Sequence, residues 1–182
     1  MALTETPTET MGAPCPDFAL PDPEGRTWTR EGVRGPRGLV VAFVCNHCPY
    51  VQAIAGRLAA DMATLADEGV GGAWIMPNDW RAYPEDAPER MAPFAARHGL
   101  SVPYLVDEGG RVARAFGAVC TPDLFGYDAG LTLQYRGRLD DVAMRGDASG
   151  RRAELLDAMR TIAGGGTVPS QTPAMGCSIK WP

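Results

Sequence analysis

Continuous hydrophobic runs alternate along the chain with segments in which hydrophobic residues recur every three or four positions. Gly38 to Val44 is such a run, and it predicts a strand that is covered on both faces. The next segment predicts a helix from about Pro49 to Asp67, with Gly69 placed to end it. Its recurring hydrophobic positions are Val51, Ile54, Leu58, Met62 and Leu65.

The same two patterns continue to the end of the chain. Further buried strands are predicted at 73–76 and 104–106, helices at 89–98, 111–116 and 151–162, and a hairpin from strands at 123–127 and 131–136. A proline-framed segment at 14–22 predicts an edge strand, because proline cannot donate to a ladder. Alternating strands and helices predict an α/β fold, with a central mixed sheet and helices on both faces.

The length and composition suit one compact domain. The chain has 182 residues, 45% of them hydrophobic, which is enough for a substantial core. We expect a flexible N-terminus over 1–13, a domain over 14–163, and a proline- and glycine-rich C-terminal tail over 164–182.

The formal charge of −5 argues against nucleic acid or an anionic membrane as a partner. A membrane-spanning helix is not expected, because no run of about 18 hydrophobic residues occurs. The first ten residues are polar and acidic, unlike a signal peptide, and the odd number of cysteines, 5, fits a reducing compartment. Together these features predict a cytoplasmic protein.

The most informative chemistry lies where the first confident strand meets its helix, at Cys45-Asn46-His47-Cys48. A thiol in the first turn of a helix lies at the positive end of the helix dipole, so its thiolate is favoured. An imidazolium at His47 would lower a thiol pKa further. We therefore expect Cys45 to be an exposed, attacking sulfur and Cys48 its partner, and the site to perform thiol–disulfide exchange.

Metal binding is the alternative interpretation of these two cysteines. Structural zinc needs four protein ligands, and the sequence offers no second Cys/His pair. A metal-binding or carrier protein that uses Cys45, His47 and Cys48 remains the competing hypothesis, although no resident metal is expected. No glycine-rich phosphate loop follows a strand, so no cofactor is expected either.

Four motifs carry a resemblance to a known family. They are Cys-Asn-His-Cys-Pro-Tyr at 45–50, Asn-Asp with Tyr-Pro-Glu-Asp-Ala-Pro-Glu at 78–89, Thr-Pro at 121–122, and Gly-Cys-Ser-Ile-Lys-Trp at 176–181. With them, residues 14–163 resemble the thioredoxin superfamily. More narrowly, the chain is similar to the redoxins, the alkyl hydroperoxide reductase/thiol-specific antioxidant group, and within these to a bacterial subfamily with this dithiol sequence.

The resemblance implies a role for each site residue. Cys45 would be the nucleophile and Cys48 the resolving thiol, while Thr121 and Pro122 would form the cis-proline loop that faces the dithiol and holds a substrate strand. The expected partners are a disulfide-containing protein or small molecule and a thiol reductant.

The chain also departs from the family pattern. A histidine before the second cysteine resembles the strongly oxidising disulfide-forming proteins. The strand before the dithiol lacks the buried acid of thioredoxins, and Asp79, Asp140 and His47 are candidate substitutes. The Pro-x-x-x-Thr/Ser-x-x-Cys pattern of peroxiredoxins is absent, so a thiol-dependent peroxidase is the alternative activity.

Two further cysteines are candidate auxiliary thiols. Cys120 directly precedes Thr121, and a small packed residue is the simpler reading of it. Cys177 in the tail could fold back as an additional resolving thiol. Alternatively, the segment around it anchors the tail through Ile179 and Trp181, which we favour because a loose hydrophobic tail would be a liability.

Overall fold

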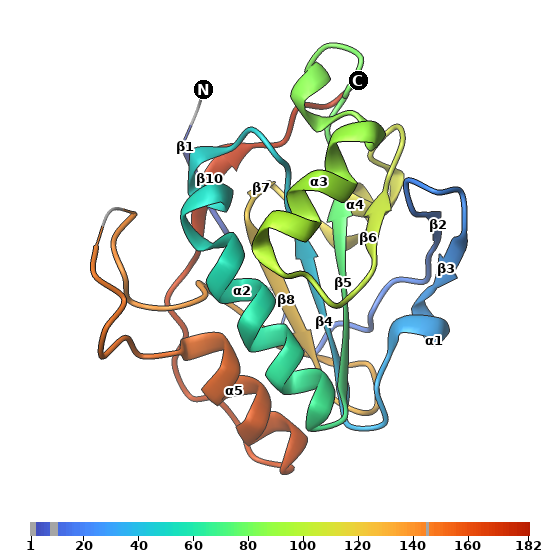
Figure 1. Cartoon of the computed structure of the whole chain (residues 1–182). Helices are drawn as coiled ribbons and strands as arrows, with labels where there is room; N and C mark the ends of the chain where they lie inside the picture. The colour runs from blue at the N-terminus through green and yellow to red at the C-terminus, as the bar shows by residue number, and fades with distance from the viewer. Residues whose placement is uncertain (1–2, 8–10, 145) are drawn as a thin grey trace.

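The computed structural model describes residues 3–7, 11–144 and 146–182. A five-stranded sheet forms its centre, in the order β6-β5-β4-β8-β9 (Figure 1). Strands β4, β5 and β6 run parallel, and β8 runs antiparallel to both β4 and β9, so the sheet is mixed as predicted. The strands are β4 (Gly38–Phe43), β5 (Val70–Met76), β6 (Tyr104–Val106), β8 (Asp123–Tyr127) and β9 (Leu133–Arg136).

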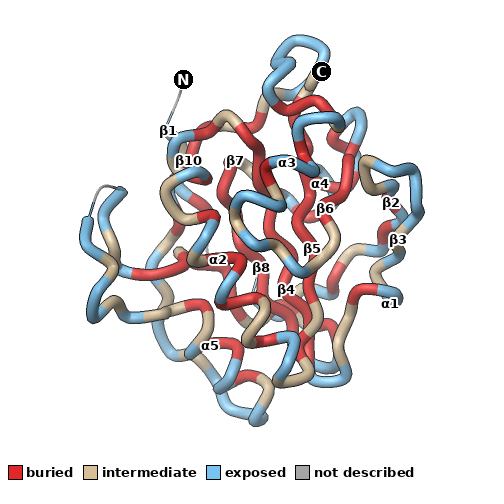
Figure 2. The backbone as a smooth tube through the Cα atoms, viewed as in Figure 1, coloured by how far each residue is buried: buried red, intermediate tan, exposed pale blue. Residues whose placement is uncertain are grey.

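Helices cover both faces of this sheet. One face packs on α2 (Pro49–Asp67), α3 (Pro88–His98) and α5 (Glu154–Ala163), and the other on α1 (Arg30–Val33) and α4 (Arg111–Phe116). Successive side chains of a strand point to opposite faces. Accordingly Val40 and Ala42 belong to one hydrophobic cluster, and Val41 and Phe43 to the other. The strands β4, β5 and β8 form the buried centre in Figure 2.

Strand β5 begins three residues before the predicted boundary. The prediction left these residues out because two of them are glycines. A Cβ on Gly71 would lie 2.1 Å from the Val33 carbonyl oxygen. The backbone at the end of α1 can therefore pack this closely against β5 only because residue 71 has no side chain. The sequence pattern treats glycine as a strand breaker, whereas this glycine serves close packing.

A second, three-stranded sheet joins the two ends of the chain, in the order β1-β10-β7. It contains β1 (Leu3–Glu5), β10 (Met175–Ser178) and β7 (Cys120–Thr121), and a separate hairpin contains β2 (Ala19–Pro21) and β3 (Thr27–Thr29). The prediction of a flexible segment over 1–13 is therefore wrong for residues 3–7 and 11–13. Residues 8–10 and the first two residues lie outside the described part of the chain.

Backbone and side-chain contacts attach this N-terminal segment. Thr6 is buried, its N–H donates to the Ala174 carbonyl at 3.0 Å, and its hydroxyl accepts from the Ala174 N–H. The Gly12 N–H donates to the Leu133 carbonyl. The threonine- and glutamate-rich composition hid these pairings, because ladder bonds are made by the backbone whatever the side chain.

Contacts outside β10 also hold the C-terminal tail. Ile179 is buried in the cluster under α4, and the Arg114 guanidinium lies 4.4 Å from the ring centre of Trp181, which stays 40% exposed. In Figure 1 this tail returns to the end of the molecule where α2 begins. Within the described residues, no helix combines the length and hydrophobicity needed to cross a membrane.

Candidate active site

The end of β4 and the start of α2 hold the two cysteines together. Cys48 is the last residue before the helix, and Pro49 takes the first helical position, where its missing N–H costs nothing. Cys45 and Cys48 are 1% and 0% exposed. The expectation of an exposed Cys45 is therefore wrong, because segments distant in the sequence cover the strand-to-helix junction.

Thr121 contacts both sulfurs. Its hydroxyl Oγ1 is 3.2 Å from Cys45 Sγ, and its carbonyl accepts from Cys48 Sγ at 3.1 Å. The Thr121–Pro122 peptide bond is cis, and the segment faces the dithiol as the family resemblance implied. Cys120 Sγ donates to the Pro122 carbonyl at 3.4 Å, and burial raises the pKa of its thiol, so it lies beside the centre as an ordinary packed cysteine.

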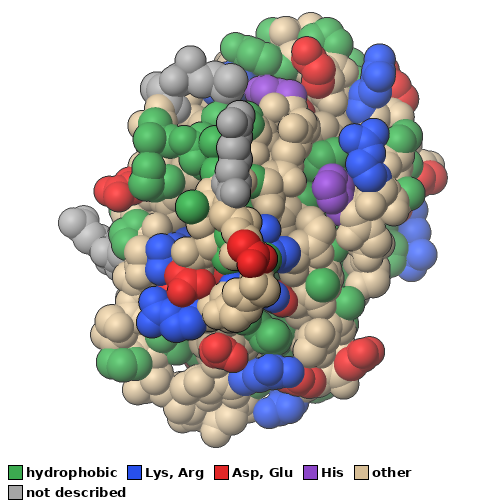
Figure 3. Space-filling view, turned by 60° about the vertical axis from the view of Figure 1, so that its left-hand side comes forward, with side chains coloured by type: hydrophobic (Ala, Val, Ile, Leu, Met, Phe, Trp, Pro, Cys, Tyr) green, Lys and Arg blue, Asp and Glu red, His purple; other side chains and the backbone are tan. Residues whose placement is uncertain are grey.

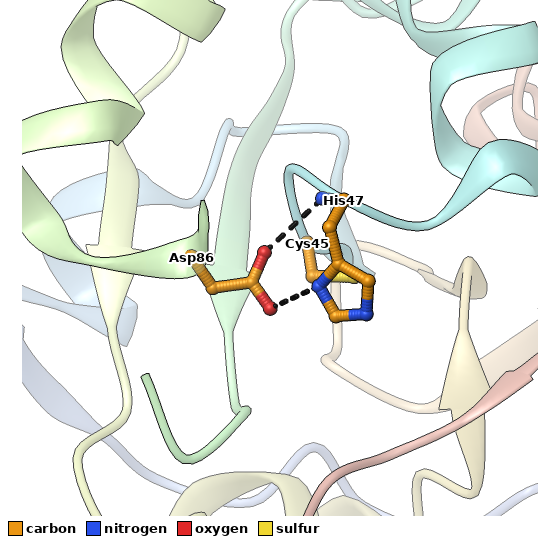
Figure 4. A group of neighbouring side chains, drawn as sticks. All are labelled: Cys45, His47 and Asp86. Atoms are coloured by element: carbon orange, nitrogen blue, oxygen red, sulfur yellow. Dashed lines mark hydrogen bonds and ion pairs between the residues drawn. The ribbon is translucent and has the colours of Figure 1, made fainter. Parts of the chain in front are cut away.

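A carboxylate that the sequence analysis missed organises the dithiol loop. Asp86 ends a 3-10 turn (Pro84–Asp86) and is fully buried. Its Oδ1 accepts the backbone N–H groups of Asn46 at 2.8 Å and His47 at 3.2 Å, and its Oδ2 contacts His47 Nδ1 at 2.7 Å and Asn78 Nδ2 at 2.8 Å. Figure 4 shows the two contacts between Asp86 and His47. These contacts occupy the lone pairs of the carboxylate.

The proposed substitutes for a buried acid lie elsewhere or act differently. Asp140 binds Arg57 and Arg151, and the Asp79 side chain accepts the Arg81 N–H. His47 does lie at the centre, but it is oriented by Asp86. Asp86 belongs to the segment that carried the resemblance, and that was the one signal in the sequence that could have pointed to it.

The Asp86 contact also sets the protonation of His47. The hydrogen bond to Asp86 raises the pKa of His47 above its usual 6.5, although partial burial opposes the shift. The imidazole stacks on Tyr83 with ring centres 5.5 Å apart. The contact with Asp86 therefore stabilises the positive imidazolium beside the sulfurs.

Cys45, His47 and Asp86 also form a cluster with the chemistry of a metal site. One ligand atom from each lies within 4.8 Å of the others. The ligand set that the structure offers therefore differs from the predicted one, because it contains Asp86 in place of Cys48. Coordination would cost Asp86 some of its hydrogen bonds, because both of its oxygens are already engaged.

Hydrogen-bond donors converge on Cys48. The Cys45 thiol donates to Cys48, which lowers the pKa of Cys48 and raises that of Cys45; the Val51 N–H at the helix start lowers the pKa of Cys48 further. Burial opposes this effect. These donors favour the thiolate at Cys48 within the reduced pair. The assignment of the attacking sulfur to Cys45 stays a prediction.

Cys177 is the third sulfur of the centre. Its S–H and its backbone N–H both donate to Cys48, and burial together with this contact raises the pKa of the Cys177 thiol to about 11. The tail is connected to the dithiol loop a second time, since the Lys180 N–H donates to Asn78 Oδ1 at 2.9 Å and Asn78 in turn binds Asp86. The expectation that this segment anchors the tail is confirmed for Ile179, and the same segment brings Cys177 to the dithiol.

Two cavities lie beside residues that neighbour the dithiol. One, of about 270 Å³, lies beside Pro122 and Tyr50 and is lined mainly by hydrophobic side chains. The other, of about 340 Å³, lies beside His47 and includes Arg90 and Arg97. On the face drawn in Figure 3, acidic and basic side chains are mixed, with hydrophobic side chains between them.

A mixed sheet, a Cys-x-x-Cys at the start of a helix and a cis-proline opposite it define a thioredoxin-like protein. More narrowly, the chain belongs to the AhpC/TSA family, which matches residues 11–139.

Comparisons with known proteins agree with this assignment. The chain is 36% identical to an uncharacterized conserved protein from Geobacillus kaustophilus, with a TM-score of 0.93 and coverage of 100% of this chain and 97% of that one. A hypothetical protein from Sinorhizobium meliloti 1021 is 35% identical, with a TM-score of 0.91 and 98% of both chains covered.

Two of the similar proteins have names that state an activity. A Mycobacterium tuberculosis protein provisionally named a peroxiredoxin is 27% identical over 68% of this chain and 74% of its own length. The peroxidoxin BcpB from the same species shares the fold, with a TM-score of 0.65 at 20% identity, over 84% of this chain and 97% of that one.

Proposed function

We propose that the protein is a thiol–disulfide oxidoreductase that cycles Cys45 and Cys48 between dithiol and disulfide. The observation that carries the proposal is the pair of buried sulfurs at the start of α2, both in contact with Thr121. A buried pair with one favoured thiolate has the proton distribution that thiol–disulfide exchange needs.

The two thiols divide the work in the exchange. Cys45 attacks one sulfur of a substrate disulfide, and the Cys48 thiolate takes the Cys45 proton as the new S–S bond forms. The Cys48 thiol then gives this proton to the released substrate thiolate. The Cys48 thiolate attacks Cys45 Sγ of the mixed disulfide, which forms the Cys45–Cys48 bond and releases the second substrate sulfur as a thiolate. The substrate is reduced by two electrons, the pair becomes a disulfide, and an external dithiol or glutathione returns it to the reduced form.

His47 and Asp86 act as positioning residues for this chemistry. The imidazolium provides a positive charge beside a developing Cys45 thiolate, and Asp86 holds both the ring and the backbone of the loop. A histidine that favours the reduced form raises the reduction potential, so the pair should be more oxidising than thioredoxin.

The reduction potential tests the proposal. The wild-type protein is equilibrated in glutathione buffers, quenched in acid, alkylated and mapped for the Cys45–Cys48 disulfide. We expect a single two-electron transition above the roughly −270 mV of thioredoxin, towards the roughly −120 mV of DsbA. A Cys120→Ser variant should titrate identically. Absence of a Cys45–Cys48 disulfide at every ratio would refute the proposal.

A thiol-dependent peroxidase is the second candidate. Although the peroxiredoxin spacing is absent, the fold brings the Thr121 hydroxyl within 3.2 Å of Cys45 Sγ, and family membership supports the same activity. Attack on a peroxide would leave a sulfenic acid on the attacking sulfur and release an alcohol or water. Rapid hydrogen peroxide consumption with dithiothreitol, and a dimedone adduct on Cys45 in Cys48→Ser, would favour this candidate over the first.

A further inference from the structure

The edge of the sheet next to the cis-proline is already occupied by the chain itself. Strand β10 pairs antiparallel with β7, with Cys177 opposite Thr121, and β1 covers the other edge of β10. A Cβ on Gly176 would lie 2.2 Å from the Thr121 carbonyl oxygen, so this close pairing requires a glycine there. The tail thus takes the position that an added strand would need in order to reach the dithiol.

This pairing aligns three sulfurs around Thr121. Cys48 Sγ contacts the Thr121 carbonyl at 3.1 Å and receives donors from both Cys45 and Cys177. Cys48 is therefore the middle sulfur, with Cys45 on one side and Cys177 on the other. All three are buried, at 1%, 0% and 4% exposure, and belong to the same core cluster.

We propose that Cys177 is a third redox-active thiol, which resolves a disulfide at Cys48 and transfers it onto the C-terminal strand. The inference rests on the proposed exchange at Cys45 and Cys48. In the step, the Cys177 sulfur attacks Cys48 Sγ of the Cys45–Cys48 disulfide. The Cys45–Cys48 bond breaks, the Cys48–Cys177 bond forms, and the proton of Cys177 passes to the released Cys45 thiolate. This step exchanges one disulfide for another and involves no net oxidation. The oxidant of the whole sequence is the substrate disulfide, which produced the Cys45–Cys48 bond.

The neighbouring cysteine provides the contrast that makes the assignment specific. Cys120 is equally buried and belongs to the same small sheet, opposite Ser178. Its sulfur, however, donates to the Pro122 carbonyl, whereas Cys177 donates to Cys48. The position of Cys177 across from Thr121, with its donors to Cys48, makes it the partner. Burial does not distinguish it, because Cys120 is equally buried and lies nearer to the cis-proline in sequence.

A disulfide between Cys48 and Cys177 would have two consequences. It would join α2 covalently to β10, and so hold the tail across the centre. It would also leave Cys45 as a free thiol while the protein is oxidised, ready to react with a second substrate molecule. The oxidised protein would then exist as two disulfide isomers in equilibrium.

Disulfide mapping with oxidised glutathione as the probe tests the proposal. In the full-length wild-type protein we expect both Cys45–Cys48 and Cys48–Cys177 peptides after acid quenching and alkylation. In Cys45→Ser, glutathione bound to Cys48 should be displaced by Cys177. In Cys45→Ser/Cys177→Ser the mixed disulfide should persist, at a level about tenfold higher. Cys45→Ser/Cys120→Ser is the matched control and should behave as Cys45→Ser does.

The outcomes separate the two proposals. Cys45–Cys48 formation without any Cys48–Cys177 peptide in the wild type, together with an equally persistent glutathione adduct in Cys45→Ser, would overturn the role of Cys177 and leave the exchange function standing. Failure of the Cys45–Cys48 disulfide itself would overturn the exchange function. The wild-type map needs no substitution, so it decides the question even if a variant folds poorly by circular dichroism.

Discussion

Two fully buried carboxylates, Asp86 beside the dithiol loop and Asp123 directly after the cis-proline, have different kinds of cationic partner. Asp123 accepts from Arg136 Nε at 3.2 Å and Nη2 at 2.8 Å, and from the Val119 N–H at 3.1 Å. Asp86 accepts from two loop N–H groups, the Asn78 amide and the His47 ring. One partner carries a permanent charge and the other a charge that depends on pH.

The difference separates a structural role from a functional one. Arg136 joins Asp123 to the Gly117 carbonyl and lies 4.5 Å from the ring centre of Phe125, so the pair ties β8 and β9 to the end of α4. Burial nevertheless raises the pKa of Asp123, with Arg136 opposing the shift. Among the residues that the structure describes, Asp86 has no arginine partner and instead contacts the His47 ring, which lies beside Cys45. The charge on that ring depends on pH, so it can change with the chemistry of the sulfurs.

Removing the permanent charge should have the largest effect on stability. Arg136→Met leaves the Asp123 carboxylate buried without its cation, which typically costs about 3–5 kcal/mol of unfolding free energy. Urea denaturation measures this loss. The reduction potential of the Cys45–Cys48 pair should stay at the wild-type value, and a shifted potential in the folded variant would contradict the separation of roles.

Asp86→Asn should lower the free energy of unfolding less than Arg136→Met does, and it should change the titration of His47. An amide cannot accept at its nitrogen, so part of the loop loses its acceptor, at a cost of about 1–3 kcal/mol in the free energy of unfolding. The pKa of His47 should fall, because its largest upward cause is the hydrogen bond to Asp86. Titration of the His47 ring by NMR tests this, with His98 as the internal reference. An unchanged His47 titration would mean that Asp86 does not set its charge.

The smallest expected effect is the pH dependence of stability due to His47. Its folded pKa is raised above the 6.5 of the unfolded chain, so the added stability is complete below 6.5 and is lost as the pH rises through the folded pKa. The ring is partly exposed, so we expect only about 1 kcal/mol. The difference in unfolding free energy between wild type and His47→Gln should shrink from pH 5.5 to pH 8.5, and a constant difference would exclude the effect.

Much of the scaffold was readable from local patterns. The hydrophobic run of β4, the period of α2 over Pro49–Asp67 and the hairpin of β8 and β9 are each properties of neighbouring residues, and the structure confirms them. The dithiol at the start of a helix and the Thr121–Pro122 segment facing it were predicted as well. A helix dipole acts within one turn, and so the pattern that makes a helix also places its first thiol.

Contacts between distant segments decided the rest. The burial of Cys45, the carboxylate of Asp86 on the loop, and Cys177 beside Cys48 all depend on how loops and strand edges meet, for which a single sequence carries no local period. Strand β1 was missed for the same reason. The sequence by itself determined the strand–dithiol–helix unit and the α/β order. Only the tertiary structure decided that Asp86 binds the dithiol loop, that Cys45 is buried and that Cys177 lies beside Cys48. Burial and hydrogen bonding are properties of the packed chain.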